Sequence, residues 1–257
     1  MNAHLPAGKC GGISMAPLGR KIPAISVEDM RTVDKNISSF DIDILQLMEN
    51  AGRTIAMLAR DLLKRTEGRK ICILAGRGNN GGDGFAAARF LHEWGASVSV
   101  VVPERYGNLH SLTRKHADSS RKAGANVLYP ADSGKFPGKI KYADMVIDAL
   151  LGYNIKGSPK GKYATLINLA NSSRNQIIAV DCPSGLNVDT GEPYNPCIKA
   201  TATLSLGLPK RGLLETSAMS YVGDLYVGDV GIPKAAYKKI GISVPNIFSD
   251  SSIVKMF

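Results

Sequence analysis

The residues from Gly76 to Gly84 combine glycines with amide and carboxyl side chains, just before a stretch that favours a helix. Glycines allow backbone N–H groups to approach a ligand closely, and the positive end of a helix dipole attracts an anion. Asn79, Asn80 and Asp83 add side-chain oxygens and amides to these backbone donors. The segment therefore predicts a pocket for a phosphate or another polar ligand. A tight strand-to-helix turn without a ligand is the alternative.

The spacing of Gly76, Gly78 and Gly81 matches the GxGxxG pattern of dinucleotide sites, which by itself is a weak signal. Glu104 lies 23 residues after Gly81 and could bind a ribose hydroxyl. Against an ordinary dinucleotide fold, the loop's polar side chains would crowd a bare pyrophosphate, and two predicted helices precede the first strand. No GK[ST] follows the loop, which excludes a Walker A site.

Polar side chains also follow two other apolar runs. Asp148 lies late in DMVIDALLG, and Asp181 and Ser184 lie at the end of QIIAVDCPSG. An unpaired aspartate is costly to bury, although a helix cap or a structural hydrogen bond would explain either one alone. In an open parallel sheet, ligands bind beyond the carboxyl ends of the strands. We therefore expect Asn80, Asp148, Asp181 and Ser184 to converge on one crevice.

The elements that must position these residues alternate along the chain. Apolar runs indicate strands at 70–76, 96–103, 126–130, 144–152, 176–185, 201–207 and 223–233. Helical spacing and capping signals indicate helices at 26–40, 41–65, 83–94, 109–125 and 163–173. Strands that are apolar on both faces and alternate with helices predict a mainly parallel sheet covered on both sides. We expect a disordered extension at 1–25 and a single domain at 26–257.

The composition is that of a globular protein, with 44% hydrophobic and 21% charged residues and no run long enough to span a membrane. The net charge of +10 favours anionic ligands, RNA among them, but the excess is spread without a run of five basic residues. The four cysteines lack CxxC spacing, so free thiols in a reducing cytoplasm are expected. The basic, glycine-rich start leaves an organellar transit peptide as an alternative.

The motifs together resemble a known family. GNNGGDG, VIDALLG and VDCPSG, with MRTVDK and LMENAGR upstream and LGLPKRGLL and VGDLYVGDVGIP downstream, resemble the YjeF N-terminal domain of the NAD(P)H-hydrate epimerase family. The resemblance covers roughly residues 26 to 233. It implies an α/β, Rossmann-like three-layer α/β/α sandwich, often a homodimer. It also implies an isomerase that repairs damaged nicotinamide cofactors by interconverting the R and S hydrates of NADH and NADPH at C6.

The resemblance also implies roles for particular residues. Substrate contacts are expected from Asn79, Asn80, Gly81, Gly82, Asp83, Gly152, Tyr153, Asn154, Ile155, Lys156, Gly157, Ser158 and Asp181. Lys156 would meet a phosphate, and Asp181 would give and take the proton at the C6 hydroxyl as the catalytic residue. One potassium ion per subunit is expected on Asn80, Asp148 and Ser184, whose oxygens suit a hard cation.

The chain departs from the family's pattern at Arg77, where proline is common, and at Tyr153 and Asn154, where small residues are usual. Bifunctional relatives carry a second, dehydratase domain. This chain ends about 24 residues after Gly-Ile-Pro, so we expect a separate protein to supply that activity. A non-catalytic RNA- or protein-binding module and an ordinary NAD(P)-dependent oxidoreductase are the alternatives. We expect neither a membrane nor a nucleic acid as partner.

Overall fold

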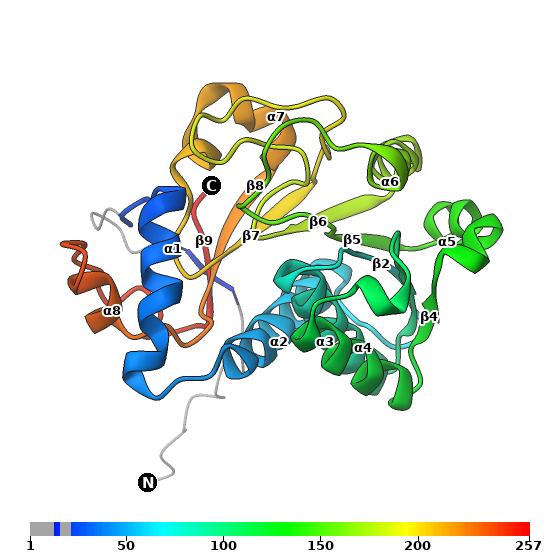
Figure 1. Cartoon of the computed structure of the whole chain (residues 1–257), viewed down its shortest axis with the longest axis horizontal. Helices are drawn as coiled ribbons and strands as arrows, with labels where there is room; N and C mark the ends of the chain where they lie inside the picture. The colour runs from blue at the N-terminus through cyan, green and yellow to red at the C-terminus, as the bar shows by residue number, and fades with distance from the viewer. Residues whose placement is uncertain (1–12, 16–21) are drawn as a thin grey trace, which may run out of the picture.

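The computed structural model describes residues 13–15 and 22–257, and a nine-stranded sheet lies at its centre (Figure 1). The strand order is β1-β9-β8-β7-β6-β5-β2-β3-β4. All adjacent pairs are parallel except β8 and β9. The strands are β1 (Ser14–Met15), β2 (Lys70–Ala75), β3 (Ser97–Val101), β4 (Asn126–Leu128), β5 (Met145–Ala149), β6 (Gln176–Val180), β7 (Ala202–Leu206), β8 (Asp224–Gly228) and β9 (Ile253–Lys255). The mainly parallel sheet is thus confirmed.

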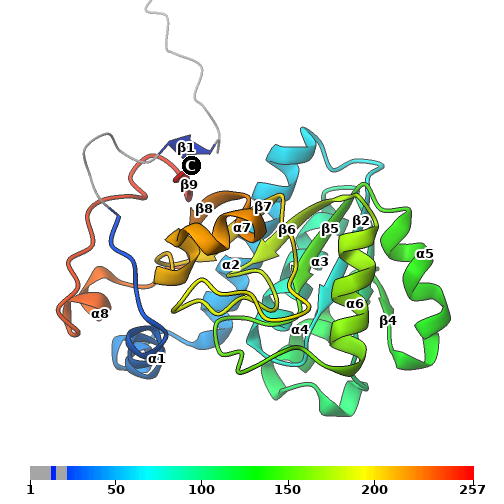
Figure 2. The same ribbon diagram turned by 90° about the horizontal axis from the view of Figure 1, so that it is seen from above.

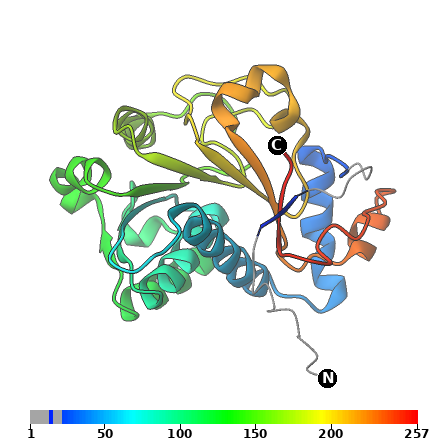
Figure 3. The same ribbon diagram turned by 180° about the vertical axis from the view of Figure 1, so that it is seen from behind.

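Helices cover both faces of this sheet. They are α1 (Val27–Asn36), α2 (Ile44–Leu63), α3 (Asn79–Glu93), α4 (Ser111–Lys122), α5 (Phe136–Lys141), α6 (Gly161–Ser172), α7 (Met219–Val222) and α8 (Lys234–Lys238). Short 3-10 helices are η1 (Ile37–Phe40), η2 (Tyr106–Asn108), η3 (Pro130–Lys135), η4 (Arg211–Leu214) and η5 (Thr216–Ala218). The helices α2, α3 and α4 lie against one face (Figure 3), and α5, α6 and α7 lie on the other (Figure 2). The three-layer sandwich is therefore confirmed.

Each face of the sheet is closed by its own apolar core. On the first face, Leu58 of α2 and Leu91 of α3 pack with strand residues such as Ile73. On the second face, Ile167 of α6 packs with strand residues such as Val146. Because β2, β5 and β6 are buried on both faces, their sequences do not alternate, and apart from Lys70, Asp148 and Gln176 all their residues are apolar.

A third apolar cluster attaches α1 to the end of the sheet that carries β8 and β9 (Figure 1). Met30 and Val33 of α1 are buried in this cluster with Tyr237 of α8. The Ser26 hydroxyl caps α1 by accepting the Asp29 N–H at 3.1 Å. The packing fixes α1 beside the carboxyl ends of the strands.

The structure differs from the sequence prediction at the glycine-rich loop. The helix predicted at 83–94 begins one turn earlier, at Asn79, with Gly78 as its N-cap. Asn79 and Asn80 therefore occupy the first turn of α3 rather than a loop before it. Asparagine and glycine disfavour helices, but close packing of this turn overrides that preference.

The predicted extension at 1–25 lies mostly outside the described residues. Of those described, β1 pairs with β9, and Ile22 and Ile25 are buried, so packing against the domain begins before residue 26. Across the described ranges, the longest apolar helical stretches fall short of what is needed to cross a bilayer.

Candidate active site

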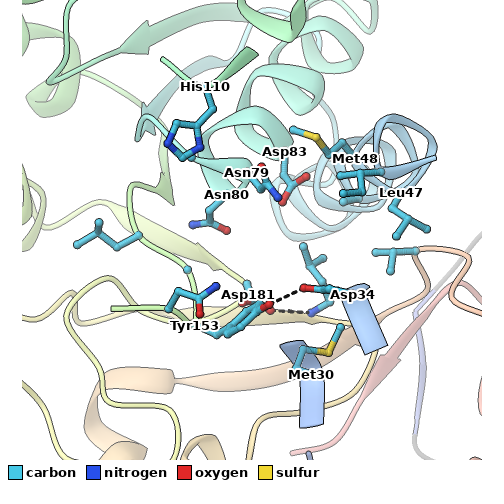
Figure 4. A pocket seen from close by; sticks show the side chains of 18 of the residues that line it. Met30, Asp34, Leu47, Met48, Asn79, Asn80, Asp83, His110, Tyr153 and Asp181 are labelled. Atoms are coloured by element: carbon cyan, nitrogen blue, oxygen red, sulfur yellow. Dashed lines mark hydrogen bonds between the residues drawn. The ribbon is translucent and has the colours of Figure 1, made fainter. Parts of the chain in front are cut away.

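A pocket of about 630 Å³ opens at the carboxyl ends of β2, β5 and β6 (Figure 4). Asn79, Asn80 and Asp83 of α3 lie on one side of it, and Asp34 and Asp181 lie on the other. The walls are completed by α1, α2 and the segment that follows β5. The strand-end argument from the sequence therefore identifies the edge of the sheet that carries the pocket.

Glycines bring three backbone segments together at the base of the pocket. A Cβ on Gly76 would lie 1.8 Å from the Leu150 carbonyl oxygen, and one on Gly81 would lie 1.9 Å from the Gly76 carbonyl oxygen. A Cβ on Gly82 would lie 1.9 Å from Cε of Met48. Gly81 and Gly82, which were expected to contact substrate, are thus buried packing positions and do not line the pocket.

Asp181 follows β6 and is 5% exposed at the pocket wall. Its backbone has a φ of 67°, a left-handed conformation that is uncommon for a residue with a side chain. The Asp181 carboxylate forms a buried ion pair with Lys210, which is 1% exposed. The Lys210 ammonium also donates to the Leu206 carbonyl at 3.0 Å. The structure thus places the Asp181 carboxyl group at the pocket wall, in contact with the buried Lys210 side chain.

Two more carboxyl groups face the same space. The Tyr153 hydroxyl donates a hydrogen bond to Asp34 of α1. Burial raises the pKa of Asp34, although the Tyr153 hydrogen bond and the Lys210 charge lower it. Burial raises the pKa of Asp83 further above its usual range, and the Asp181 and Asp34 charges add to that effect. Burial in the pocket therefore raises the pKa of both carboxyl groups that lie beside the Asp181–Lys210 pair.

Asp148 lies beneath the pocket at the end of β5 and is fully buried. Its carboxylate accepts the Ser184 N–H at 2.8 Å, the Ser184 hydroxyl at 2.7 Å and the Leu150 N–H at 3.2 Å. The Ser184 Oγ also accepts the Leu151 N–H at 2.9 Å. Burial raises the pKa of Asp148 to about 6 even though these hydrogen bonds lower it. Asp148 and Ser184 thus join the ends of β5 and β6.

Asn80 lies in the first turn of α3, beside the segment that follows β5. Its side-chain Oδ1 and Nδ2 are buried, and neither has a hydrogen-bond partner among the described residues. The side chain lies against Gly152, where an added Cβ would be 3.4 Å from the Asn80 Cβ. An orphaned buried amide is expensive, so this arrangement calls for a ligand atom or ion.

The loop after β5 is divided between the pocket and the surface. Gly152, Tyr153, Asn154 and Ile155 line the pocket, whereas Lys156, Gly157 and Ser158 are exposed and do not. Arg31 of α1 donates to the Asn154 side chain at 2.7 Å. Together with the Tyr153–Asp34 hydrogen bond, this contact ties the loop to α1. Tyr153 and Asn154 therefore hold this wall of the pocket against α1.

Sequence reasoning missed several pocket residues. Lys210 and Asp34 lie in the quoted blocks LGLPKRGLL and MRTVDK, but the sequence gives no sign that Lys210 is buried. An apolar wall was also missed, although helical spacing in α2 could have indicated part of it; its residues are Met30, Ile37, Ile44, Leu47, Met48, Ala51, Leu206, Val230 and Ile232. The pocket is therefore apolar at one end and polar at the other.

The polar end contains Arg77, Glu104, His110 and Tyr163. Glu104, suggested by the sequence as a ribose ligand, thus lies in the same pocket as the first turn of α3. In residues 13–15 and 22–257, no three His, Cys, Asp or Glu side chains are grouped to hold a metal ion. Any cation near Asn80 would have to use amide, hydroxyl and backbone oxygens as well as one carboxylate.

Known proteins are similar in sequence to this chain over most of its length. The family described as "YjeF-related protein N-terminus" matches residues 44–212. An NAD(P)H-hydrate epimerase of Dehalogenimonas lykanthroporepellens is 36% identical over 87% of this chain and 88% of its own. One of Lentilactobacillus buchneri is 38% identical over 81% and 94%. A bifunctional NAD(P)H-hydrate repair enzyme of Moorella thermoacetica is 37% identical over 82% of this chain. The chain spans 41% of the length of that relative.

A solved structure shares the fold. The crystal structure of the yeast protein ynu0, YNL200c, superposes with a TM-score of 0.79 and covers 91% of this chain and 100% of its own. Its sequence is 24% identical. The likeness supports the arrangement of layers and strands described above.

Proposed function

Because this chain belongs to the family of YjeF-related N-terminal domains, we propose that it interconverts the R and S hydrates of NADH and NADPH at C6. It is then an isomerase of nicotinamide cofactor repair. The observation that carries this proposal is the Asp181 carboxylate, which faces a pocket of about 630 Å³ and is paired with buried Lys210. An acid–base group at a pocket wall is what inversion of a hydroxyl-bearing carbon requires.

We propose that Asp181 moves the proton of the C6 hydroxyl. The configuration at C6 can invert by departure and return of the hydroxyl, or by opening and closing of the ring. Both routes need a group that takes a proton and gives it back. Such acid–base assistance typically contributes about 10²–10⁴-fold to the rate.

The two ends of the pocket suit the two ends of the substrate. The apolar wall, which includes Met30, Leu47 and Met48, suits the reduced nicotinamide ring beside Asp181. The first turn of α3 presents the positive end of a helix to the pocket, which suits the pyrophosphate. Lys156, on the exposed part of the loop, remains our proposed phosphate contact.

We further propose that a potassium ion binds between Asn80, Asp148 and Ser184. The residues fit such an ion, because the Asn80 oxygen is buried without a partner and Asp148 is a buried carboxylate without an ion pair in the described residues. Hard cations prefer such oxygens. A bound cation would stabilise ionised Asp148 and so secure the β5 and β6 ends. The ion should raise the melting temperature relative to tetramethylammonium at equal ionic strength, and Asn80→Ala should abolish the difference.

We also propose a compartment, an oligomeric state and a companion enzyme for the protein. Cys72, Cys182 and Cys197 are free and buried, which supports a reducing compartment such as the cytoplasm. A homodimer is proposed from the family resemblance, and light scattering of the purified protein measures it. A separate dehydratase would then restore the cofactor from one of the two epimers.

The experiment that tests the function supplies one pure C6 epimer of hydrated NADH to the purified protein. Chromatography follows the approach to the R/S equilibrium, with potassium or with tetramethylammonium, against the spontaneous rate. We expect catalysed interconversion that is faster with potassium. A rate equal to the spontaneous one under both conditions would remove the proposal. The same assay with hydrated NADPH measures the preference between the two substrates.

A further inference from the structure

Besides Glu104 at the polar end, three carboxyl groups line the described pocket, namely Asp34, Asp83 and Asp181, and of these only Asp181 is paired with a buried lysine. Lys210 contacts Asp181, whereas Asp34 receives a hydrogen bond from Tyr153. No ion pair involves Asp83 in the described residues. Burial disfavours the charged form of each carboxyl group, and a cation within contact distance favours it. The Lys210 ammonium therefore favours the charged form of Asp181 more than that of the other two carboxyl groups.

The contacts of Lys210 show that it acts through Asp181. Its ammonium donates to Asp181 Oδ1, to the Leu206 carbonyl at 3.0 Å and to the Ser205 hydroxyl at 3.4 Å. An ammonium has three N–H donors, so none is left for a substrate. Asp181 Oδ1 also accepts the Leu206 N–H at 3.5 Å, while Oδ2 has no hydrogen-bond partner in the described part of the chain. The free oxygen belongs to a residue that lines the pocket.

Both members of the pair are held by the backbone. The Ile25 N–H donates to the Pro209 carbonyl at 2.9 Å, and the Arg211 N–H donates to the Ile25 carbonyl at 3.0 Å, so Lys210 is fixed on both sides. The Asp181 N–H donates to the Leu204 carbonyl at 2.8 Å. These contacts maintain the left-handed backbone of Asp181. Such backbone strain persists where the surroundings fix it, and it clusters at active sites.

We propose that Lys210 is a positioning residue that keeps Asp181 as a carboxylate, so that Asp181 begins the epimerisation as a base. The proposal rests on the proposed function and distinguishes between its two routes. Departure of the hydroxyl needs a proton donor first, because hydroxide is a poor leaving group. Opening of the ring needs a base first. A carboxylate that is paired with a buried ammonium can act as the base that opening of the ring requires.

The base-first route balances without a further reactant. Asp181 takes the proton of the C6 hydroxyl, the C6–N1 bond breaks, and C6 becomes an aldehyde. The electron pair of the broken bond goes to N1 and is delocalised through the C2–C3 double bond onto the carboxamide. After rotation about C5–C6, N1 attacks the other face of the aldehyde and Asp181 returns the proton. The oxygen on C6 is the same atom throughout.

The route is tested by a single turnover in water enriched in ¹⁸O. We expect the inverted epimer to keep its original oxygen. Solvent oxygen in the product at the rate of epimerisation would show departure of the hydroxyl and would overturn the proposal. The spontaneous reaction in the same water gives the background exchange.

The role of Lys210 is tested with Lys210→Met, Asp181→Asn and the double variant. We expect Lys210→Met to lower kcat about 100-fold or more with little change in KM, and to add almost nothing in the Asp181→Asn background. Equal losses in both backgrounds would overturn the proposal. Lys255→Met removes the partner of Asp224 in an exposed ion pair outside the pocket, so it serves as the matched control. Thermal unfolding of each variant checks that it folds.

A measurement without substrate separates this inference from the proposed function. Carbon-13 NMR of the Asp181 carboxyl group reports whether it is ionised at neutral pH. We expect it to be ionised in the wild type and protonated in Lys210→Met; an ionised carboxylate in both would overturn the role of Lys210, whether or not the protein is an epimerase. The other titratable groups that face Asp181 are Asp34, Asp83, Tyr153, Cys182 and Tyr237.

Discussion

Replacing Gly81 by alanine tests why the first turn of α3 is rich in glycine. The added Cβ would lie 1.9 Å from the Gly76 carbonyl oxygen and 2.6 Å from the Gly76 carbonyl carbon. Both atoms belong to the backbone at the end of β2, so no side-chain rotation relieves the overlap. The helix or the strand end must move by about 1 Å to bring the Cβ and the Gly76 carbonyl oxygen to a separation of 3.0 Å. The strand end and the pocket floor would move with it.

The cost follows from two opposing effects. Overpacking that forces the backbone to shift typically destabilises by about 1–3 kcal/mol, and a backbone-to-backbone overlap belongs at the upper end of that range. Alanine in a helix regains up to about 1 kcal/mol over glycine. We therefore expect a net loss of about 2 kcal/mol in the free energy of unfolding. For a chain of this length, that loss corresponds to roughly 4–8 °C in melting temperature.

The assay is denaturant and thermal unfolding of Gly81→Ala beside Gly78→Ala. Gly78 lies in the same segment with a φ of −94°, and its added Cβ would come no nearer than 3.8 Å to the His110 ring. The control should change stability by less than about 1 kcal/mol. If Gly81→Ala is as stable as its control, the steric reasoning is refuted.

Three further changes have definite expected outcomes. Ser184→Ala removes the hydrogen bond that the hydroxyl donates to buried Asp148 and the one that it accepts from the Leu151 N–H, and it should cost about 1–3 kcal/mol in denaturant unfolding; an unchanged midpoint would contradict this. The pKa of Asp83 is raised in the folded protein above its ordinary value of 3.8, so the free energy of unfolding of the wild type falls as pH rises from about 3.8 through the pKa of the folded state. Asp83→Asn should therefore be more stable than the wild type at pH 7 but not at pH 4. Equal effects at both pH values would disprove it. The Cys72 thiol is 1% exposed and its pKa is raised by burial to about 12, so mass spectrometry should find it unlabelled by thiol reagents until the protein unfolds; rapid labelling in the native state would be inconsistent with its burial.

The strands of the central sheet could be predicted because burial on both faces leaves a plain signal. Runs such as KICILAG are apolar after their first residue, and the structure places β2 there with five of its six residues buried. The start of α3 could not be predicted. Its Asn-Asn-Gly-Gly turn has low helix propensity, and only the close contacts of Gly81 and Gly82 explain why glycine stands there. The strands β1 and β9, at one end of the sheet, are two and three residues long, too short to leave a pattern.

The pocket was predictable where its residues follow strands. Asp181 comes directly after β6, Asn80 lies in the first turn of the helix that follows β2, and both line the pocket. Lys210 was not predictable, because its burial depends on Ile25, which is 185 residues away in the sequence and pairs with it. Asp34 likewise reaches the pocket only through the packing of α1.

The most direct test of the central claim compares the wild type with Asp181→Asn in a single turnover of one pure hydrate epimer. Asparagine keeps the size and polarity of the side chain but cannot take up the hydroxyl proton. We expect the variant to fold and to bind the hydrate, while its rate of C6 inversion falls by about 10²-fold or more. Inversion by Asp181→Asn at close to the wild-type rate would show that another group moves the proton, and the assignment of this pocket wall as the catalytic centre would be wrong.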